Sequence, residues 1–245
     1  MKLLTIGEIL VEIVATTKGN GFLEAQPLIG PFPSGSPAIF IDQAGKLGFP
    51  CVILSRVGND DFGTLNIQRL NKDGVDVKGI EVAIGETTGS AFVRYRNDGN
   101  RNFIFNILHS ACGKLTLNTT AKAIIEECDA LHIMGSALIT PNLQELVLWA
   151  VKNIKQRGGK ISFDPNLRNE LINQSGLTET LLQVLEKTDI FLPSGNEMFI
   201  FTTAQKESEA IDELLEKGIS EIILKRGNQG ASFFSKKERI DISPI

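Results

Sequence analysis

Polar and charged residues gather where the sequence predicts that β-strands end. Residues 164–168 contain a carboxylate, an amide and a guanidinium, and residues 193–197 contain a serine and a carboxylate. Residues 225–230 supply an ammonium group and glycines, and residues 34–36 offer free backbone N–H groups before a helix. Because ligands bind beyond the carboxyl ends of strands in open α/β sheets, this set predicts a polar crevice for a polyhydroxylated or anionic ligand.

Each motif also has a purely structural explanation. Gly7, which follows the first predicted strand, can simply end that strand tightly, and residues 34–36 can be a helix cap. Asp164 and Arg168 can form a local ion pair, and Glu197 can be a first-turn carboxylate favoured by the helix dipole. Gly227 and Gly230 can be hairpin glycines. Taken singly, no motif decides between structure and function.

The elements that must position these residues alternate between short β-branched runs and longer runs of helical spacing. Strands are expected at residues 3–6, 51–57, 130–134, 160–163, 189–192 and 221–224, with a further strand pair around Phe233 and Arg239. Helices are expected at residues 40–47, 64–73, 121–128, 142–156, 176–186 and 208–217. This alternation predicts an α/β fold, a mostly parallel sheet with helices on both faces.

Two hairpin signals interrupt that alternation. Residues 9–14 and 24–29 flank a turn at 18–21, and residues 90–96 and 101–107 flank the Asn-Asp-Gly-Asn turn at 97–100. Hairpins do not join a parallel sheet easily, so a small separate sheet is expected. A small sheet over the open end of a larger one acts as a lid. We therefore expect one domain, 1–245, with lid segments at roughly 9–32 and 86–108.

Composition excludes several classes of protein. With 25 Lys and Arg against 29 Asp and Glu, the net charge of −4 argues against a basic nucleic-acid-binding surface. Three scattered cysteines, Cys51, Cys112 and Cys128, lack metal-site spacing and fit small buried side chains in a reducing compartment. The sequence shows neither a signal-peptide pattern nor an apolar run of about 18 residues. A cytoplasmic protein without a membrane or nucleic-acid partner is expected.

The order of the motifs resembles the ribokinase-like (PfkB) carbohydrate kinase family. The segment S-G-S-P-A at 34–38 and G-K-L-G at 45–48 resemble its N-terminal signature, and V-G-N-D-D-F-G at 57–63 resembles its V-G-x-D-x-F-G segment. The lid motifs T-G-x-A and D-G-x-R have counterparts at 88–91 and 98–101. F-D-P-N-L-R at 163–168 resembles the F-D-P-N-x-R motif of the sugar-kinase branches of the family. K-R-G at 225–227, together with Gly230, resembles the K-x-G-x-x-G motif of the strand that binds the nucleotide.

The resemblance implies ATP-dependent phosphoryl transfer to a hydroxyl of a sugar or sugar acid, with fructokinase-like and 2-keto-3-deoxygluconate kinase-like branches nearest. It also implies a homodimer through the lid and a Mg²⁺ ion. The sugar-binding residues would be Glu12, Gly35, Arg101, Asn166 and Arg168. The nucleotide-binding residues would be Ser194, Glu197, Lys225, Gly227 and Gly230, with Glu197 acting on the magnesium indirectly through water.

The sequence departs from the family pattern in three places. Ile39 stands where the signature has a substrate-contacting Asn, and Ser194 replaces the Asn of N-x-x-E. The D-T-x-G-A-G-D segment, whose last Asp is the general base, has no counterpart before Ile245. No catalytic base is therefore assigned within residues 1–245, and these residues alone are expected to show little or no kinase activity.

Two other functions remain open as alternatives. One is a non-catalytic sugar-binding or regulatory module with the same fold, which would bind sugar without nucleotide. The other is a nicotinamide-dependent Rossmann enzyme, which the sequence disfavours because G-x-G-x-x-G is missing between the first strand and helix. The lid aromatics Phe92, Tyr95, Phe103 and Phe105 are expected to face a second subunit or the sugar.

Overall fold

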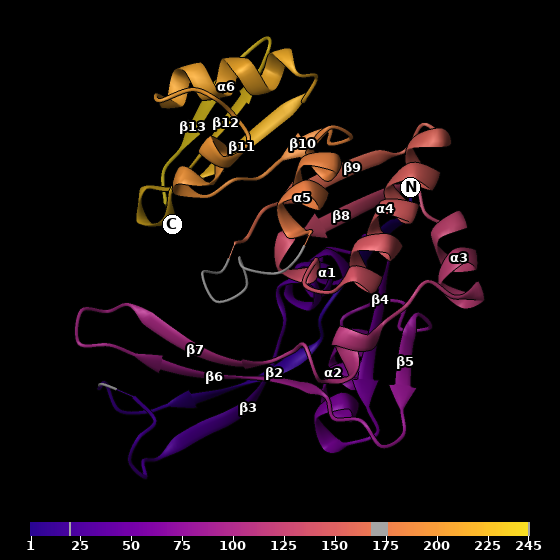
Figure 1. The fold of residues 1–245 in the computed structure, drawn as a ribbon, viewed down its shortest axis with the longest axis vertical. Helices are drawn as coiled ribbons and strands as arrows, with labels where there is room; N and C mark the ends of the chain where they lie inside the picture. The colour runs from indigo at the N-terminus through magenta and orange to yellow at the C-terminus, as the bar shows by residue number, and fades with distance from the viewer. Residues whose placement is uncertain (20, 168–175, 245) are drawn as a thin grey trace. The chain divides into compact units, whose positions relative to one another are not determined.

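The computed structural model describes residues 1–19, 21–167 and 176–244 (Figure 1). The chain divides into two compact units. Unit 1 consists of Met1–Ile6 together with Leu117–Ile245, and unit 2 consists of Gly7–Thr116. Within the described residues, no helix is long and apolar enough to cross a membrane.

Unit 1 is built on a mostly parallel sheet. Its strands are β1 (Leu3–Ile6), β8 (Ala130–Met134), β9 (Lys160–Asp164), β10 (Ile190–Phe191), β11 (Glu221–Lys225), β12 (Ala231–Ser235) and β13 (Arg239–Ile242). They lie in the order β13-β12-β11-β10-β9-β8-β1. The pairs from β1 to β11 are parallel, and β12 and β13 extend the sheet antiparallel. The α/β class predicted from the sequence is confirmed.

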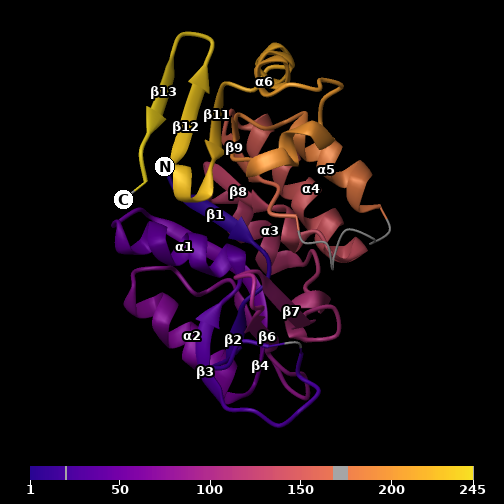
Figure 2. The ribbon, with the colours of Figure 1, turned by 90° about the vertical axis from the view of Figure 1, so that its left-hand side faces the viewer.

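The helices of unit 1 lie along one side of its strands in Figure 2. They are α3 (Thr119–Glu126), α4 (Pro141–Gln156), α5 (Leu177–Leu185) and α6 (Glu207–Glu216). Helix α4 begins where Thr140 accepts a hydrogen bond from the Leu143 N–H at 3.3 Å, with Pro141 in the first turn. Its apolar stripe, including Val147 and Ile154, is fully buried.

A cluster of three phenylalanines joins the central strands to the segment after β10. The ring centroids of Phe163 on β9 and Phe191 on β10 lie 5.7 Å apart. Phe201 packs against both with its ring nearly perpendicular, at 5.9 and 5.5 Å. All three side chains are buried, so their packing holds the segment after β10 against strands β9 and β10.

Unit 2 contains a parallel strand pair, two helices and a second sheet. Strands β4 (Cys51–Gly58) and β5 (Ile80–Ala83) pair in parallel. The small sheet has the order β3-β2-β6-β7, with β2 (Leu10–Ala15), β3 (Leu28–Ser34), β6 (Gly89–Tyr95) and β7 (Arg101–Asn106). The two antiparallel hairpins meet through a parallel pairing of β2 with β6. The predicted small separate sheet is confirmed.

Some predicted boundaries were wrong. The strand expected at 24–29 forms at Leu28–Ser34, because its pairing with β2 begins where Ala15 lies opposite Leu28. Helix α1 (Ser36–Lys46) starts four residues earlier than expected because Pro37 lies in its first turn, where its missing N–H costs nothing. Strand β5 was not predicted.

Asp60 explains why helix α2 (Asp61–Lys72) starts where it does. Its carboxylate accepts the Gly63 N–H at 2.8 Å, and it also accepts the Thr88 N–H and hydroxyl at 2.8 and 2.7 Å. Burial raises the pKa of Asp60, but the hydrogen bonds from Thr88 and Gly63 outweigh burial and hold that pKa below its usual value. The V-G-N-D-D-F-G segment therefore ties the start of α2 to the residue before β6.

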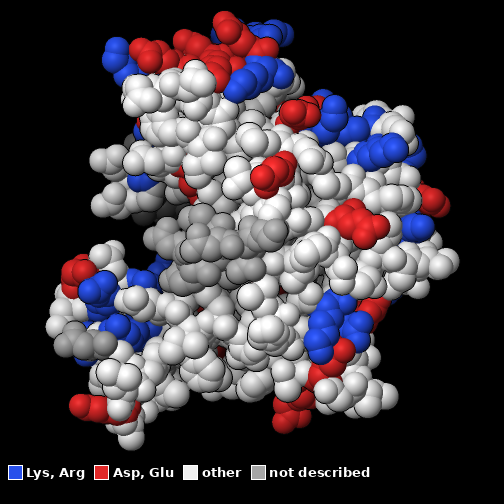
Figure 3. All heavy atoms as spheres, in the orientation of Figure 1, with Lys and Arg blue, Asp and Glu red and all other residues white. Residues whose placement is uncertain are grey.

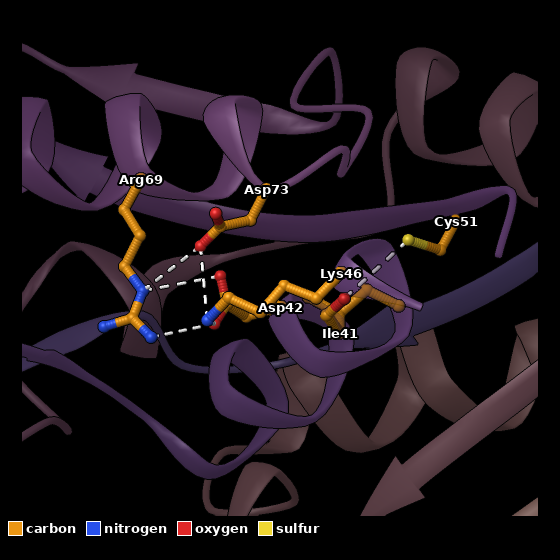
Figure 4. A network of polar contacts seen from close by, with 6 residues as sticks. All are labelled: Ile41, Asp42, Lys46, Cys51, Arg69 and Asp73. Atoms are coloured by element: carbon orange, nitrogen blue, oxygen red, sulfur yellow. Dashed lines mark hydrogen bonds and ion pairs between the residues drawn. The ribbon is translucent and has the colours of Figure 1, made fainter. Parts of the chain in front are cut away.

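Helices α1 and α2 are joined by an ion-pair network (Figure 4). Asp42 has 7% of its side chain exposed and lies 2.7 Å from Lys46 Nζ and 2.8 Å from Arg69 Nη2. Asp73 contacts the same two cations at 3.3 and 3.7 Å. Burial raises the pKa of Asp42, but the hydrogen bonds from Arg69 and Lys46 outweigh it and lower that pKa. The network fixes α1, whose first residues follow Gly35.

Replacing Asp42 tests this network. Asp42→Asn should lower the free energy of unfolding at pH 7 by about 1–2 kcal/mol, because two half-exposed cations lose the nearer of their two anions and keep only Asp73. Since the folded-state pKa of Asp42 is depressed, its contribution is present above the unfolded pKa of about 3.9 and is lost as the pH falls through the folded value. Urea denaturation at pH 7 and pH 3 should show the difference from wild type shrinking at pH 3.

Glu209→Gln is the matched control. It removes an exposed carboxylate 3.2 Å from Lys206, so its effect should stay below about 0.5 kcal/mol. Equal losses for the two variants, or no loss for Asp42→Asn, would show that the network does not hold α1 to α2.

Candidate active site

The carboxyl ends of the parallel strands β8 to β11 meet at one edge of the unit 1 sheet. The chain turns into short irregular segments there: Gly135–Ala137 after β8, residues 165–167 after β9, Gly195–Ile200 after β10 and Gly227–Gln229 after β11. The segments after β9, β10 and β11 are the ones that the sequence predicted for a ligand-binding edge, whereas the one after β8 was not predicted.

An ion pair connects two of these strand ends. Lys225 Nζ lies 2.5 Å from Asp164 Oδ2, although the two residues are 61 positions apart. Only 11% of the Asp164 side chain is exposed, against 37% for Lys225. The other Asp164 oxygen accepts the Asn166 N–H at 3.1 Å. One carboxylate therefore holds both the cation on β11 and the turn after β9.

Glu197 makes a second connection between strand ends. Its Oε1 accepts the Leu167 N–H at 2.9 Å, and its Oε2 accepts the Ser194 N–H at 2.6 Å. Ser194 and Glu197 form a capping box at the start of the turn after β10. Glu197 is thus a first-turn carboxylate, as its structural explanation requires. The remaining lone pairs of its carboxylate can still accept hydrogen bonds from water.

Asn166 adopts a strained backbone between these two carboxylates. Its φ of 40° lies in the left-handed region, and it is the one non-glycine residue with positive φ among the described residues. Its side-chain amide donates to Ser136 Oγ at 3.3 Å. Residues kept in such conformations cluster at functional sites. Arg168, the other predicted sugar-binding residue on this turn, lies outside the described residues.

His132 lies fully buried on β8. Its Nδ1 is 2.9 Å from Ser162 Oγ. Burial, and then the charge of Lys225, lower the pKa of His132 to about 3, so the ring is neutral at physiological pH. His132 therefore carries no positive charge that would repel the ammonium of Lys225.

Arg226, next to Lys225, points to a different task. Its guanidinium binds the Glu207 carboxylate through two bonds of 2.9 and 2.5 Å, and its Nε donates to Ser232 Oγ at 2.7 Å. Hydrogen bonding from Arg226 lowers the pKa of Glu207. Acidic side chains gather over α6 in Figure 3, and Glu207 stands at the first position of that helix. Arg226 thus anchors the turn after β11 to α6.

The two predicted nucleotide-binding glycines differ in their surroundings. Both have positive φ, 58° at Gly227 and 88° at Gly230. A Cβ at Gly227 would meet no heavy atom within 4 Å, so its backbone stays open to a ligand. A Cβ at Gly230 would collide with the carbonyl oxygen of Ile242 on β13. The hairpin explanation therefore accounts for Gly230.

Unit 2 holds the remaining predicted sugar-binding residues. Glu12 on β2 is half-buried and accepts a hydrogen bond from Ser34 Oγ at 2.9 Å. Gly35 has φ 108°, and a Cβ there would lie 2.5 Å from the Glu8 carbonyl oxygen, so only glycine fits. Ile39, the departure from the family signature, is 55% exposed in α1.

Arg101 lies far from Glu12 on the small sheet. It pairs with Tyr95 across β6–β7, whereas Glu12 pairs with Ala91 across β2–β6. Four residues along β6 separate the two rows, which is about 13 Å. Arg101 is exposed, with its guanidinium carbon 5.8 Å from the centre of the Phe103 ring. The structure does not bring these two predicted residues together.

Sequence reasoning missed Ser136, and it did not pair Asp164 with Lys225. Asp164 was visible as a carboxylate after a strand, but its pairing with Lys225 depends on the order of strands in the sheet. The parallel arrangement predicted for β9, β10 and β11 was the one signal that could have suggested it. Nothing in the sequence around Ser136 singles it out.

The contrast between the glycines is testable. Gly230→Ala should destabilise the β12–β13 hairpin, because the added methyl group displaces β13 as well as straining φ. Gly227→Ala is the control, since its φ of 58° is also positive but its added methyl group would meet open space. Hydrogen exchange should be markedly faster in β13 of the first variant only. Equal exchange in the two variants would contradict a packing role for Gly230.

Known proteins share this architecture. A candidate ribokinase II from E. coli superposes with a TM-score of 0.92 at 48% identity, covering 100% of this chain and 79% of that one. A second structure with the same name, solved in complex with ATP and Mg²⁺, superposes with a TM-score of 0.91. Fructokinase-1 of Zea mays is 28% identical over 234 residues, which is 95% of this chain and 72% of the maize protein.

Family comparison covers the whole sequence. Residues 1–245 match the pfkB family carbohydrate kinases. The match includes both units and all of the strand-end residues described above. The chain therefore belongs to the pfkB family of carbohydrate kinases.

Proposed function

We propose that this protein binds ATP at the strand edge of unit 1 and serves the phosphorylation of a hydroxyl of a sugar or sugar acid. That residues 1–245 alone are nearly inactive stays a prediction. The observation that carries the proposal is the Asp164–Lys225 pair, which sets a partly exposed ammonium beside the Asn166 turn. Fructokinases among the relatives favour a fructokinase-like substrate, with a 2-keto-3-deoxygluconate-like sugar acid as the second choice.

The residues present fit a nucleotide in part. Lys225, whose side chain is 37% exposed, would meet phosphate oxygens with its ammonium, and the open backbone of Gly227 would let a phosphate approach closely. Bound Mg²⁺ would neutralise phosphate charge, with Glu197 acting on it through water. Ser194 and Glu197 would keep the adjoining turn in place, while Gly230 would act through the hairpin.

The sugar side of the proposal rests on acceptors and donors with spare capacity. Among the described residues no donor binds Oε2 of Glu12, which leaves that oxygen for a sugar hydroxyl. Gly35 would let the sugar approach the backbone. The sugar-binding roles of Arg101, Asn166 and Arg168 stay predictions, and on the small sheet the pairing register separates Arg101 from Glu12. The small sheet acting as a lid, a homodimer through that lid and a cytoplasmic location stay predictions.

Calorimetry tests the two binding steps that this function requires. The protein should bind a non-hydrolysable ATP analogue with Mg²⁺ and one of the two sugar classes. Glu12→Gln should weaken sugar binding about tenfold or more, because a charge-assisted hydrogen bond is lost while the acceptor for Ser34 remains. The nucleotide affinity should not change.

Glu24→Gln is the control variant, because Glu24 is an exposed carboxylate on the connection between β2 and β3. It should leave both affinities unchanged. Sugar binding without nucleotide binding would favour the non-catalytic sugar-binding module. Binding of neither ligand would contradict the proposed function.

A further inference from the structure

Asp164 is the least exposed charged group at the strand edge, and it has two partners at once. Its Oδ2 holds Lys225 Nζ at 2.5 Å, and its Oδ1 holds the Asn166 N–H at 3.1 Å. With 11% of its side chain exposed, Asp164 itself offers little surface to a ligand. Any role in ligand binding must therefore be exerted through its partners.

Lys225 is the partner that a ligand can reach. Its side chain is 37% exposed, and the backbone at its carboxyl side continues into the open Gly227 turn. A lysine side chain has four rotatable bonds, so ordering a free one costs entropy when an anion binds. A buried carboxylate that already orders the ammonium removes part of that cost.

We propose that Asp164 is a positioning residue that aims the Lys225 ammonium at the phosphates of the nucleotide. The inference rests on the proposed function, because it assigns Lys225 to that ligand. Protein kinases provide a precedent for such a pair, since the lysine that meets their nucleotide phosphates must itself be paired with a glutamate. Asp164 also accepts the Asn166 N–H, so the same carboxylate positions both the Lys225 ammonium and the turn that carries the predicted sugar-binding amide.

The same molecule provides a matched carboxylate without this task. Asp189 has 12% of its side chain exposed, binds Lys155 and Lys160 at 2.9 and 3.2 Å, and accepts the Ile161 N–H at 2.9 Å. Asp189 directly precedes β10, and Asp164 is the last residue of β9. Because β9 and β10 run parallel, the two carboxylates lie toward opposite edges of the sheet. Asp164 and Asp189 thus share chemistry and burial but not location.

The test measures nucleotide affinity by calorimetry with a non-hydrolysable ATP analogue and Mg²⁺. Asp164→Ala should weaken binding about three- to tenfold, because the ammonium must be ordered by the ligand itself. Asp164→Asn, which keeps a neutral acceptor and its shape, should recover part of that loss. Asp189→Asn should leave the affinity unchanged, even if it lowers the melting temperature as much.

A double-mutant cycle shows whether Asp164 acts through the lysine. In a Lys225→Met background, Asp164→Ala should cost little further affinity, because the group that it positions is gone. An equal loss in both backgrounds would overturn the proposal. So would an unchanged or tighter affinity in Asp164→Ala, since tighter binding means that the carboxylate merely competes with phosphate for Lys225.

A ligand-independent readout separates this proposal from the proposed function. The acylation rate of Lys225, followed by peptide mass spectrometry, should rise several-fold in Asp164→Ala and not in Asp189→Asn. If wild type binds no nucleotide, the proposed function fails, whatever the acylation rates are. If the acylation rates are equal in wild type and Asp164→Ala, Asp164 does not hold the lysine and the positioning role is overturned.

Discussion

The edge of the unit 1 sheet depends on one constraint, the need to satisfy backbone N–H groups where parallel strands end. Past the last ladder bond those groups have no strand partner, and leaving them unpaired inside the protein is costly. Two carboxylates meet the need: Asp164 takes the Asn166 N–H, and Glu197 takes those of Leu167 and Ser194. The two groups thereby place negative charge at the edge where a ligand would bind, and Asp164 also holds Lys225 there.

Structural and ligand-binding explanations of these residues are therefore not exclusive. Glu197 caps its own turn and joins it to the next strand end, while keeping lone pairs for water. Gly230 is the opposite case, since its lack of a side chain is explained by β13 alone. Gly227, with open space around it, has no such packing reason. Counting motif residues without their contacts would have treated all three alike.

The sequence predicted most elements because hydrophobic periodicity and capping are local signals. Strand β8 was predicted at the bounds observed, and α4 to within one residue. The start of α1 was missed because its first turn contains Pro37, which interrupts the run of helix-forming residues that begins at Ala38. The short strand β5 escaped because its pairing with β4, rather than its own composition, defines it.

The candidate site was predictable only in outline. The parallel order of the strands predicted that residues 164–168, 193–197 and 225–230 share an edge, and unit 1 shows the described ones there. Which atoms pair could not be predicted, because the contact between Asp164 and Lys225 depends on side-chain reach across β10. On the small sheet, the pairing register separates Arg101 from Glu12, which the hairpin signal alone did not reveal.

Hydrogen–deuterium exchange with and without Mg²⁺ and a non-hydrolysable ATP analogue tests the central claim most directly. If the strand edge of unit 1 receives the phosphates, the nucleotide should slow exchange at residues 166–167 and 225–227. The outer strand β13 should be unaffected. Unchanged exchange at both of these turns, with protection elsewhere in the chain, would contradict the placement of the nucleotide.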